Sequence, residues 1–353
     1  MKTIYCVTGA NGHLGNVLVQ KLCLLGHQVR ALMLPEDTCH LTPNSLLSVY
    51  QGDICNPESL SAFFECPTDC QLIVIHAAGI VSIASKVDPT IYKVNVQGTK
   101  NIVSLCLKHS VKRIVYVSSV HAIEEQKQGC WIHEPPHFDP TKVIGAYAKT
   151  KAEASQVVLD AVQQGLDAVI VHPSGILGPF DYGHGHLTQM VEDYLNGRLK
   201  ACVRGGYDFV DVRDVANGII AACTKGRKGE CYLLSNHYMS VEDLLYLLHK
   251  VSGKRSIRIV LPMWFAKATA GLSELYYKLL HQKPLYTSYS LYTLTSNGLF
   301  CHEKATQELG YSPRPLIKTV EDTAVFLNAQ GRIRDRKHRL CIKRPAHLQS
   351  LLP

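Results

Sequence analysis

Apolar runs alternate with helical patterns through the first half of the chain. Short runs rich in β-branched residues predict buried strands at residues 4–8, 27–34, 71–79, 113–119 and 168–175. Between them, apolar residues at helical spacing predict helices at about 14–25, 91–108 and 145–164. Asn56 and Pro57 suit the cap and first turn of another helix. This alternation favours a doubly wound α/β fold, in which helices cover both faces of a parallel sheet.

The alternation loosens beyond residue 175. Loops such as GPFDYGHGH and helices rich in Leu, Tyr and Trp predict a smaller, mainly helical lobe over residues 176–330. Segments at about 200–235 are expected to return to the sheet domain of residues 1–175. Small and polar residues follow the predicted strands in the segments TGANG, GD, HAAG, SSV and HPSG. Because such sheets bind ligands beyond the carboxyl ends of their strands, we expect the functional site there, beneath the helical lobe.

The composition is that of an ordinary globular protein. Of 353 residues, 46% are hydrophobic and 19% charged, which excludes a disordered chain and allows one or two domains. The 13 cysteines form no CxxC pair, and several lie within apolar runs, at Cys6, Cys23, Cys106 and Cys223. This distribution predicts buried free thiols in a reducing cytoplasm and argues against a disulfide framework or a zinc site.

The net charge of +8 is concentrated at the C-terminus. Residues 331–353 hold seven Lys or Arg and one Asp, so six of the eight net charges lie in this basic tail, which is expected to be solvated. An acidic surface is the alternative partner, and no motif elsewhere indicates nucleic-acid binding. The most apolar stretch, LPMWFAKATAGLSELYYKLL, contains Lys267, Glu274 and Lys278, so it predicts an amphipathic helix and no membrane span.

The segment TGANGHLG, residues 8–15, places three glycines at a spacing of three between a predicted strand and a helix. Gly9 can adopt a backbone conformation closed to other residues. Gly12 lets the main chain approach a diphosphate, which the free N–H groups and dipole of a helix start favour. Gly15 allows helix and strand to pack closely. A glycine-rich turn alone is the plainer interpretation, but strand, turn and helix in this order predict a dinucleotide site.

Tyr147 and Lys151 lie four residues apart in GAYAKTKAE, and therefore on one face of a predicted helix. An ammonium group near a phenol lowers the phenol pKa toward working pH, as an acid or base for an alcohol–ketone pair requires. The preceding strand ends in Ser118 and Ser119, whose hydroxyl groups can hydrogen-bond a substrate oxygen. An exposed helix face is the default for such a pair. The position of the helix after a strand of the same sheet favours a catalytic role.

The chain resembles the extended short-chain dehydrogenases/reductases, the NAD-dependent epimerase/dehydratase superfamily. The matching segments are TGANGHLG, GDI, HAAG, NVQGT, VYVSS, YAKTK, HPSGILGP and FVDVRDVA, which span about residues 3–225 in the expected order. The similar branch contains dihydroflavonol reductases, 3β-hydroxysteroid dehydrogenases and sugar-nucleotide epimerases and dehydratases. The resemblance implies a Rossmann-type sheet and an NAD(P)-dependent oxidoreductase that interconverts a ketone and a secondary alcohol by hydride transfer.

The resemblance also assigns roles to residues of this sequence. It implies Ser119, Tyr147 and Lys151 as the catalytic residues, with Ser119 chosen because the family's serine is the last of the run. Asp53 would contact the adenine, Pro173 and Ser174 would lie beside the nicotinamide, and Asn95 would organise the active site. The implied cofactor-binding set is Gly9, Asn11, Gly12, His13, Leu14, Gly15, Asp53, Ile54, Ala77, Ala78, Gly79, Tyr147, Lys151, Pro173 and Ser174.

The choice between NAD and NADP stays open. Relatives that prefer NAD carry an acid at the position of Met33, and many that prefer NADP carry an arginine at the position of Leu34. Neither residue type is present here. Glu36 and Asp37 lie close enough to favour NAD, whereas Arg30 favours NADP less strongly.

Residues near the predicted site argue against two enzyme types of the family, the dehydratases and the epimerases. Val120 and His121 follow Ser119, where dehydratases carry an acid pair, and Tyr207 stands where epimerases often hold a diphosphate with arginine. Aromatic residues of the C-terminal half are expected to pack mostly in the core, with some lining an apolar pocket: Trp264, Phe265, Tyr276, Tyr277, Tyr286, Tyr289 and Tyr292. We therefore expect an apolar or polycyclic small-molecule substrate, of dihydroflavonol or hydroxysteroid type.

Two alternatives remain. One is a sugar-nucleotide epimerase, and the other is an NAD(P)-sensing regulatory protein, although relatives of that type lose the Tyr/Lys pair. Dimers are frequent in the family, which suggests a homodimer. His184 and His186 in YGHGHL suggest a substrate loop or surface histidines, and no metal site is predicted because a third ligand is missing. No role is assigned to His172.

Overall fold

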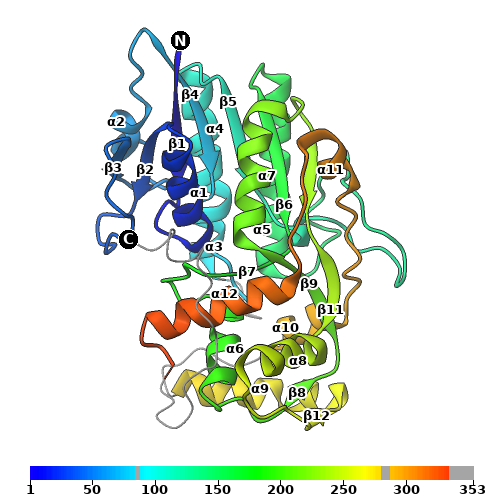
Figure 1. Cartoon of the computed structure of the whole chain (residues 1–353). Coiled ribbons are helices and arrows are strands. Elements are labelled where there is room, and N and C mark those ends of the chain that lie inside the picture. The colour runs from blue at the N-terminus through cyan, green and yellow to red at the C-terminus, as the bar shows by residue number, and fades with distance from the viewer. Residues whose placement is uncertain (84–87, 280–286, 334–353) are drawn as a thin grey trace.

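The computed structural model describes residues 1–83, 88–279 and 287–333, with side chains of helix α9 (Met263–Leu279) described as far as Gly271. Figure 1 shows an upper sheet domain and a lower, mainly helical lobe. The lobe lies beyond the carboxyl ends of the main strands, because β1 runs downward from the N-terminus. This is the edge at which the sequence places the functional site.

Seven parallel strands form the central sheet, in the order β10-β6-β5-β4-β1-β2-β3. The strands are β1 (Lys2–Thr8), β2 (Gln28–Met33), β3 (Leu47–Gln51), β4 (Cys70–His76), β5 (Arg113–Val117), β6 (Ala168–Pro173) and β10 (Cys231–Leu234). The order reverses between β1 and β4, which is the switch point where such sheets bind ligands. The predicted doubly wound parallel sheet is confirmed, whereas β3 and β10 were not predicted as individual strands.

Helices cover both faces of this sheet, and each face has its own apolar core (Figure 1). They are α1 (His13–Leu24), α2 (Ser61–Phe64) after the 3-10 turn η1 (Pro57–Leu60), α4 (Thr99–Lys108), α5 (Ala146–Gln163) and α7 (Val212–Lys225). Helices α1 and α7 cover one face, while α4 and α5 cover the other. In α1, Val17, Leu18 and Leu22 are buried as their spacing predicts. Leu25 is 60% exposed because the helix ends one residue earlier.

The predicted helix at 91–108 is not one regular helix. It consists of α3 (Pro89–Tyr92), a π-helical segment η2 (Lys93–Gly98) and α4. π-Helical segments are rare and are often found at functional sites. Here the segment carries Asn95, which is buried against α5.

The lower lobe contains the helices α6 (His186–Leu195), α8 (Val241–Ser252), α9 and α10 (Ser288–Thr295), with the short strands β8 (Cys202–Val203) and β12 (Val260–Leu261). A three-stranded sheet links it to the upper domain: β7 (Gly175–Leu177), β9 (Gly206–Asp211) and β11 (His237–Ser240). Two helices follow, α11 (Glu303–Leu309) and α12 (Leu316–Ala329). Figure 1 shows α12 lying between the sheet domain and the lower helices.

Buried charges fasten α7 and α12 together. Asp211 caps α7 through the backbone N–H of Arg213, and the Arg213 guanidinium pairs with both Asp211 and Asp322, each at 2.7 Å. Arg314 donates to both carboxylate oxygens of Asp214. Buried charges are tolerated when they are paired in this way. The segment FVDVRDVA therefore has a structural role at the junction of the two parts.

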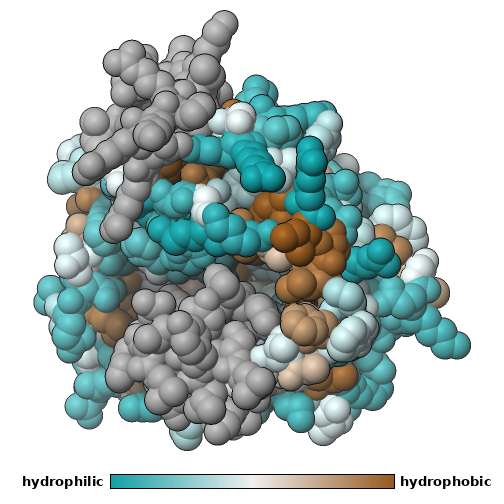
Figure 2. Space-filling model, turned by 90° about the horizontal axis from the view of Figure 1, so that it is seen from below, coloured by the Kyte–Doolittle hydropathy of each residue, from teal (hydrophilic) through white to brown (hydrophobic). Residues whose placement is uncertain are grey.

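Surface and tail features follow the sequence only in part. Cys6, Cys23, Cys106 and Cys223 are buried free thiols, as predicted. Of the seven aromatic residues expected mostly in the core, Tyr289 is buried, whereas Trp264 is 71% exposed and Phe265 is 42% exposed. Figure 2, which views this lobe from below, shows apolar atoms gathered at the surface. The side chains of Tyr276, Tyr277 and Tyr286 and residues 334–353 of the basic tail lie outside the described residues.

Within the described part of the chain, no helix combines the length and apolarity needed to cross a bilayer.

Gly15→Ala tests the close packing of α1 on the sheet. A Cβ at Gly15 would overlap the carbonyl oxygen of Gly9 and lie 2.8 Å from Cα of Ala10. We expect the free energy of unfolding to fall by about 1–3 kcal/mol in urea titrations, because backbone atoms must move. Gly271→Ala is the matched control, since no atom lies within 4 Å of its added Cβ, and it should gain up to about 1 kcal/mol from helix propensity. Equal effects of the two substitutions would contradict this account.

Candidate active site

The glycine turn has the geometry of a phosphate cradle. Gly9 has φ of +66°, and a Cβ there would lie 2.7 Å from Cα of Ala78. Gly12 precedes α1 without a side-chain cap, so the first N–H groups of the helix, those of His13, Leu14 and Gly15, have no capping side chain. Free N–H groups and the helix dipole favour an anion at this point. The turn therefore fits the pyrophosphate of a dinucleotide.

The side chains of Asn11 and His13 in the glycine turn hydrogen-bond to neighbouring loops. Asn11 donates to the carbonyl of Thr38 at 2.8 Å and accepts from the N–H of His40 at 2.9 Å. The Nε2 atom of His13 lies 2.9 Å from the carbonyl oxygen of Pro179. Because these side chains are engaged within the protein, the turn offers a phosphate its backbone N–H groups.

A buried polar network joins the glycine turn to the end of β4. The hydroxyl of Thr8 lies 2.7 Å from Nδ1 of His76 and accepts from the N–H of Ala78 at 3.2 Å. The other ring nitrogen of His76 lies 3.1 Å from the hydroxyl of Thr99. Burial lowers the pKa of His76 to about 3, so the imidazole is neutral at pH 7. Sequence analysis missed this histidine.

Asn95 holds the segment after β4 against the catalytic helix. Its side-chain oxygen accepts from the N–H of Ile80 at 2.8 Å, and its amide nitrogen donates to the Ile80 carbonyl at 3.0 Å. The same nitrogen donates to the hydroxyl of Thr150 in α5 at 3.1 Å. A Cβ at Gly79 would lie 3.2 Å from Oδ1 of Asn95 and 3.4 Å from Nζ of Lys151. Asn95 thus fixes the segment after β4, including Gly79, against which the Lys151 side chain lies.

The two serines at the end of β5 face different partners. The hydroxyl of Ser118 lies 2.7 Å from that of Ser155, inside the contact between β5 and α5. The side chain of Ser119 lowers the pKa of Tyr147 and also caps the 3-10 turn η3 (Val120–Ala122) by accepting from the N–H of His121. This geometry favours Ser119 over Ser118 as the partner of the catalytic tyrosine.

Tyr147 and Lys151 are both buried in α5, one turn apart. Nζ of Lys151 donates to the carbonyl of Val117 at 2.8 Å and to the hydroxyl of Tyr116 at 3.4 Å, and it lies over the Tyr116 ring. Burial lowers the pKa of Lys151 to about 7. Lys151 therefore lies beside Gly79, at the edge that also carries the glycine turn, and Tyr147 precedes it by one turn of α5.

The electrostatics of Tyr147 differ from the sequence-based expectation that Lys151 lowers its pKa. Burial raises the pKa of Tyr147 to about 12, and the hydrogen bond with Ser119 lowers it by a smaller amount. Desolvation disfavours the phenolate more than its neighbours favour it. The phenol is therefore protonated at pH 7, which suits a general acid.

The remaining predicted cofactor residues lie in two places, in the loop after β3 and at the end of β6. Oδ1 of Asp53 accepts from the N–H of Cys55 at 2.8 Å in the loop after β3. The side chain of Ile54 is buried in the core, close to Gly98. Pro173 ends β6, and Ser174 donates to Oδ1 of Asp208. Burial raises the pKa of Asp208 to about 6.

The residues considered for the choice between NAD and NADP lie in β2 and in the loop after it. The guanidinium of Arg30 donates to the carbonyls of Phe63 and Glu65 and lies over the ring of Tyr50, so it is engaged away from the cofactor edge. Met33 is buried, whereas Glu36 and Asp37 are exposed.

Aromatic residues from three segments surround Tyr147, and sequence analysis did not join them. The ring centroid of His121 lies 6.0 Å from those of Tyr147 and Tyr289. The hydroxyl of Tyr207 lies 2.9 Å from Nε2 of His121, and these two rings are stacked. Burial lowers the pKa of His121 to about 4. Each of the three was noted separately in the sequence, His121 and Tyr207 by their positions in family motifs and Tyr289 as one of several aromatic residues.

His172 supports the catalytic loop from behind. Its Nδ1 lies 2.9 Å from the carbonyl oxygen of Ser119, and burial lowers its pKa to about 4. Its ring packs on Phe138, with centroids 5.1 Å apart. Phe138 also lines a cavity of about 370 Å³ enclosed by the loop over residues 122–142.

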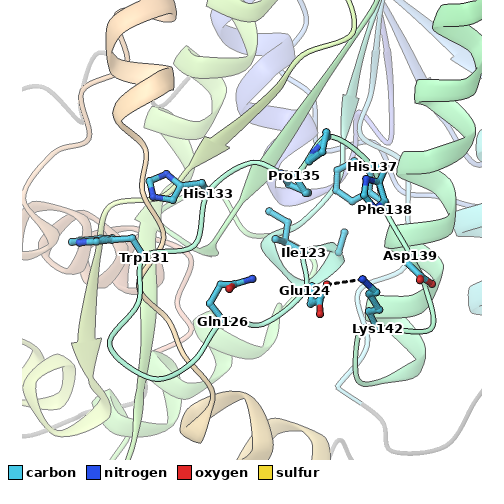
Figure 3. Close-up of a pocket in the computed structure, with 12 residues that line it drawn as sticks. Ile123, Glu124, Gln126, Trp131, His133, Pro135, His137, Phe138, Asp139 and Lys142 are labelled. Atoms are coloured by element: carbon cyan, nitrogen blue, oxygen red, sulfur yellow. Dashed lines mark ion pairs between the residues drawn. The ribbon is translucent and has the colours of Figure 1, made fainter.

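Figure 3 shows this cavity, with Trp131 and His133 on one side and His137 and Phe138 on the other. Glu124 and Lys142 form an ion pair at 3.4 Å across its edge. None of Ser119, Tyr147 and Lys151 lines it. The cavity is therefore separate from the three predicted catalytic residues.

The histidines of YGHGHL belong to the start of α6. Nδ1 of His184 lies 2.8 Å from the guanidinium of Arg332, which also pairs with Glu192 at 2.7 Å. His186 is the first residue of α6. Across residues 1–83, 88–279 and 287–333, no group of three or more His, Cys, Asp or Glu side chains could hold a metal ion.

Comparison with known proteins places the chain in a family. Residues 5–235 match the NAD dependent epimerase/dehydratase family, and the chain belongs to it. It is 30% identical to a candidate dihydroflavonol 4-reductase of Synechocystis sp. (95% of this chain, 97% of the relative). It is also 30% identical to the 3 beta-hydroxysteroid dehydrogenase type 7 of Mus musculus (88% and 91%). The chain is thus an NAD(P)-dependent oxidoreductase of this family.

Solved structures agree on the fold. The crystal structure of gox2253 matches with a TM-score of 0.79 and 30% identity, over 94% of this chain and 99% of that chain. The UDP-glucose 4-epimerase of Thermotoga maritima matches with a TM-score of 0.73 and 19% identity, over 93% and 99%. The second likeness concerns the fold alone.

Lys151→Met tests the burial of the ammonium group through the pH dependence of stability. The folded-state pKa of about 7 is below the ordinary lysine value of 10.5, so between these two values the unfolded chain binds more protons. The stability of the wild type should therefore rise relative to Lys151→Met from pH 7 to pH 10, by up to about 1.4 kcal/mol per pH unit. Urea unfolding at several pH values measures this difference.

Lys149→Met is the control, because Lys149 is exposed on the same helix. It should change stability by the same amount at every pH. A Lys151→Met difference that does not vary with pH would contradict the burial of a charged amine.

Proposed function

We propose that this protein interconverts a ketone and a secondary alcohol, with Ser119, Tyr147 and Lys151 as its catalytic residues. The observation that carries this proposal is that the Ser119 hydroxyl acts on the buried phenol of Tyr147, which lies one helical turn from Lys151 in α5, at the strand edge that also holds the glycine turn. Hydroxyl, phenol and ammonium groups at one place supply the proton transfer and oxygen binding that a carbonyl reduction needs.

Each residue has a defined part in the reduction. Tyr147, protonated at pH 7 because burial raises its pKa to about 12, gives its proton to the carbonyl oxygen. Ser119 donates a hydrogen bond to the same oxygen and stabilises its developing negative charge. Bound NAD(P)H supplies the hydride for the carbonyl carbon, so that the ketone gains two electrons and two hydrogens and NAD(P)⁺ is left. In the alcohol oxidation the same groups act in reverse.

The cofactor is held by residues on both sides of the switch point. The backbone N–H groups at the start of α1 bind the pyrophosphate, and Asp53 contacts the adenine. Lys151, next to Gly79, holds the ribose. Pro173 and Ser174 lie beside the nicotinamide. Asn95 acts through its bonds to Ile80 and Thr150 and is a positioning residue.

The proposed substrate is apolar and flat, of the dihydroflavonol or hydroxysteroid type. Aromatic rings of His121, Tyr207 and Tyr289 lie around Tyr147, which suits stacking against a ring system. The names of relatives support this class, including a sterol demethylase protein B of Methylococcus capsulatus at 29% identity. A sugar-nucleotide epimerase is the alternative, and Tyr207 in place of a diphosphate-binding arginine argues against it.

Two further proposals concern the setting of the protein. Free buried cysteines favour a reducing compartment, so we place it in the cytoplasm. Frequent dimers in the family favour a homodimer. A regulatory protein that senses NAD(P) without turnover is the non-enzymatic alternative, which the retained Tyr147 and Lys151 argue against.

Tyr147→Phe is the direct test. Purified protein is incubated with NADH or NADPH and a panel of flavanone, steroid and bicyclic ketones, and absorbance of the reduced cofactor is followed. The substitution removes the proton donor, so kcat should fall by about 100-fold or more while the cofactor Kd stays within about twofold. Near wild-type kcat in the variant would overturn the assignment. Tight cofactor binding by the wild type without turnover of any ketone would favour the regulatory alternative.

Ser119→Ala tests which serine binds the reacting oxygen. The lost hydrogen bond should lower kcat about 10- to 100-fold, with a small effect on the cofactor Kd. Ser118→Ala is the matched control, because its hydroxyl bonds Ser155 and lies within the contact of β5 and α5. It should leave kcat within about threefold of the wild type. The reverse ranking of the two variants would assign the role to Ser118.

A further inference from the structure

Tyr289 of α10 lies directly against the start of the catalytic helix. Gly145, the residue before α5, has φ of +105°, and a Cβ there would overlap the Tyr289 ring, 2.6 Å from its Cζ. Helix α10 begins with a reciprocal capping box between Thr287 and Ser290, and the Thr287 hydroxyl also donates to the carbonyl of Ile83. The ring of Tyr289 is therefore held in a defined position beside Tyr147.

The side chains around this ring are uncharged at neutral pH. His121 lies 6.0 Å from Tyr289 between ring centroids and 6.0 Å from Tyr147. Its pKa of about 4 keeps the imidazole neutral. Tyr207 stacks on His121, and burial raises the pKa of Tyr207 and of Tyr289 above the usual value. Such a surface favours neutral, flat molecules over anionic diphosphates.

The Tyr289 hydroxyl is buried without a hydrogen-bond partner among the described residues. Tyr289 as a whole is only 8% exposed. Two neighbouring phenols are hydrogen-bonded: Tyr207 lies 2.9 Å from Nε2 of His121, and Tyr292 donates to Glu125. Buried hydroxyl groups are normally paired, and an unpaired one is costly to keep. A ligand atom that completes the bond explains why a tyrosine stands here, since a phenylalanine would pack equally well.

We propose that the Tyr289 hydroxyl is a second substrate anchor, which binds an oxygen of the substrate other than the one that Tyr147 protonates. This proposal rests on the proposed function. It narrows the substrate class to uncharged, flat ketones that carry a second oxygen, as a hydroxyl or keto group remote from the reacting carbonyl. The rings of His121 and Tyr207 lie beside the two tyrosines, and Tyr289 sets the orientation of the substrate. Tyr289 is thus a residue that determines specificity.

Tyr289→Phe tests the anchor with pairs of ketones that differ by one hydroxyl. The probes are 1-tetralone and its 5-, 6- and 7-hydroxy derivatives, with NADH and NADPH. The wild type should prefer one hydroxytetralone over 1-tetralone by about tenfold in kcat/KM, mainly through KM. Tyr289→Phe should abolish this preference and change kcat/KM for 1-tetralone by less than about twofold.

Tyr292→Phe is the matched control, because its ring stacks on Tyr289 from the same helix and its hydroxyl already bonds Glu125. It should keep the wild-type preference. Thermal unfolding is the second readout: Tyr289→Phe should unfold at the same or a higher temperature than the wild type, since it removes an unpaired buried group. A lower unfolding temperature would indicate a structural bond and contradict the proposal.

The outcomes separate this inference from the function on which it rests. If the wild type reduces 1-tetralone but prefers no hydroxytetralone, or if Tyr289→Phe keeps the preference, the anchor is overturned and the proposed function stands. If the wild type reduces no ketone in the tetralone, flavanone or steroid series, the proposed function fails and the anchor fails with it.

Discussion

The common direction of the seven central strands is the constraint on which this structure depends. Because all the strands run parallel, their carboxyl ends lie at one edge, and residues far apart in the sequence meet there. Thr8 at the end of β1, Gly79 after β4 and Ser119 after β5 are brought to the same edge. The close approach of Gly9 to Ala78 then ties the two strands that flank the switch point. Catalytic and cofactor-binding groups share one site for this reason.

Burial sets the chemistry of that edge. His76, His121 and His172 are all held neutral at pH 7 because desolvation lowers the pKa of each imidazole. The same effect lowers the pKa of Lys151 and raises that of Tyr147. A proton therefore rests on the phenol in the free protein, and the site selects for neutral groups. Packing around the catalytic helix, more than any single charge, decides these protonation states.

Local patterns in the sequence predicted the parts of the fold that have local causes. The glycine turn and the Tyr147/Lys151 pair are short motifs on one strand–helix unit or one helix, and apolar runs revealed five strands. The strand β3 was missed because it is largely exposed and lacks a clear apolar alternation. The raised pKa of Tyr147 depends on burial, and Tyr289 reaches the site from residues far along the chain. No sequence pattern links His121, Tyr207 and Tyr289.

The π-helical segment of residues 93–98 has a consequence for how this protein can vary. A π turn contains one residue more than the α turn it replaces. Removal of one residue would let the stretch close as a regular α-helix with its flanking turns nearly in phase, because a shorter α segment covers about the same angle as the π segment. Residues inside the stretch would change the direction in which they point, so the bonds of the Asn95 amide to Ile80 and Thr150 depend on the π turn. The extra residue therefore serves the placement of one side chain and leaves the course of the helix around it unchanged.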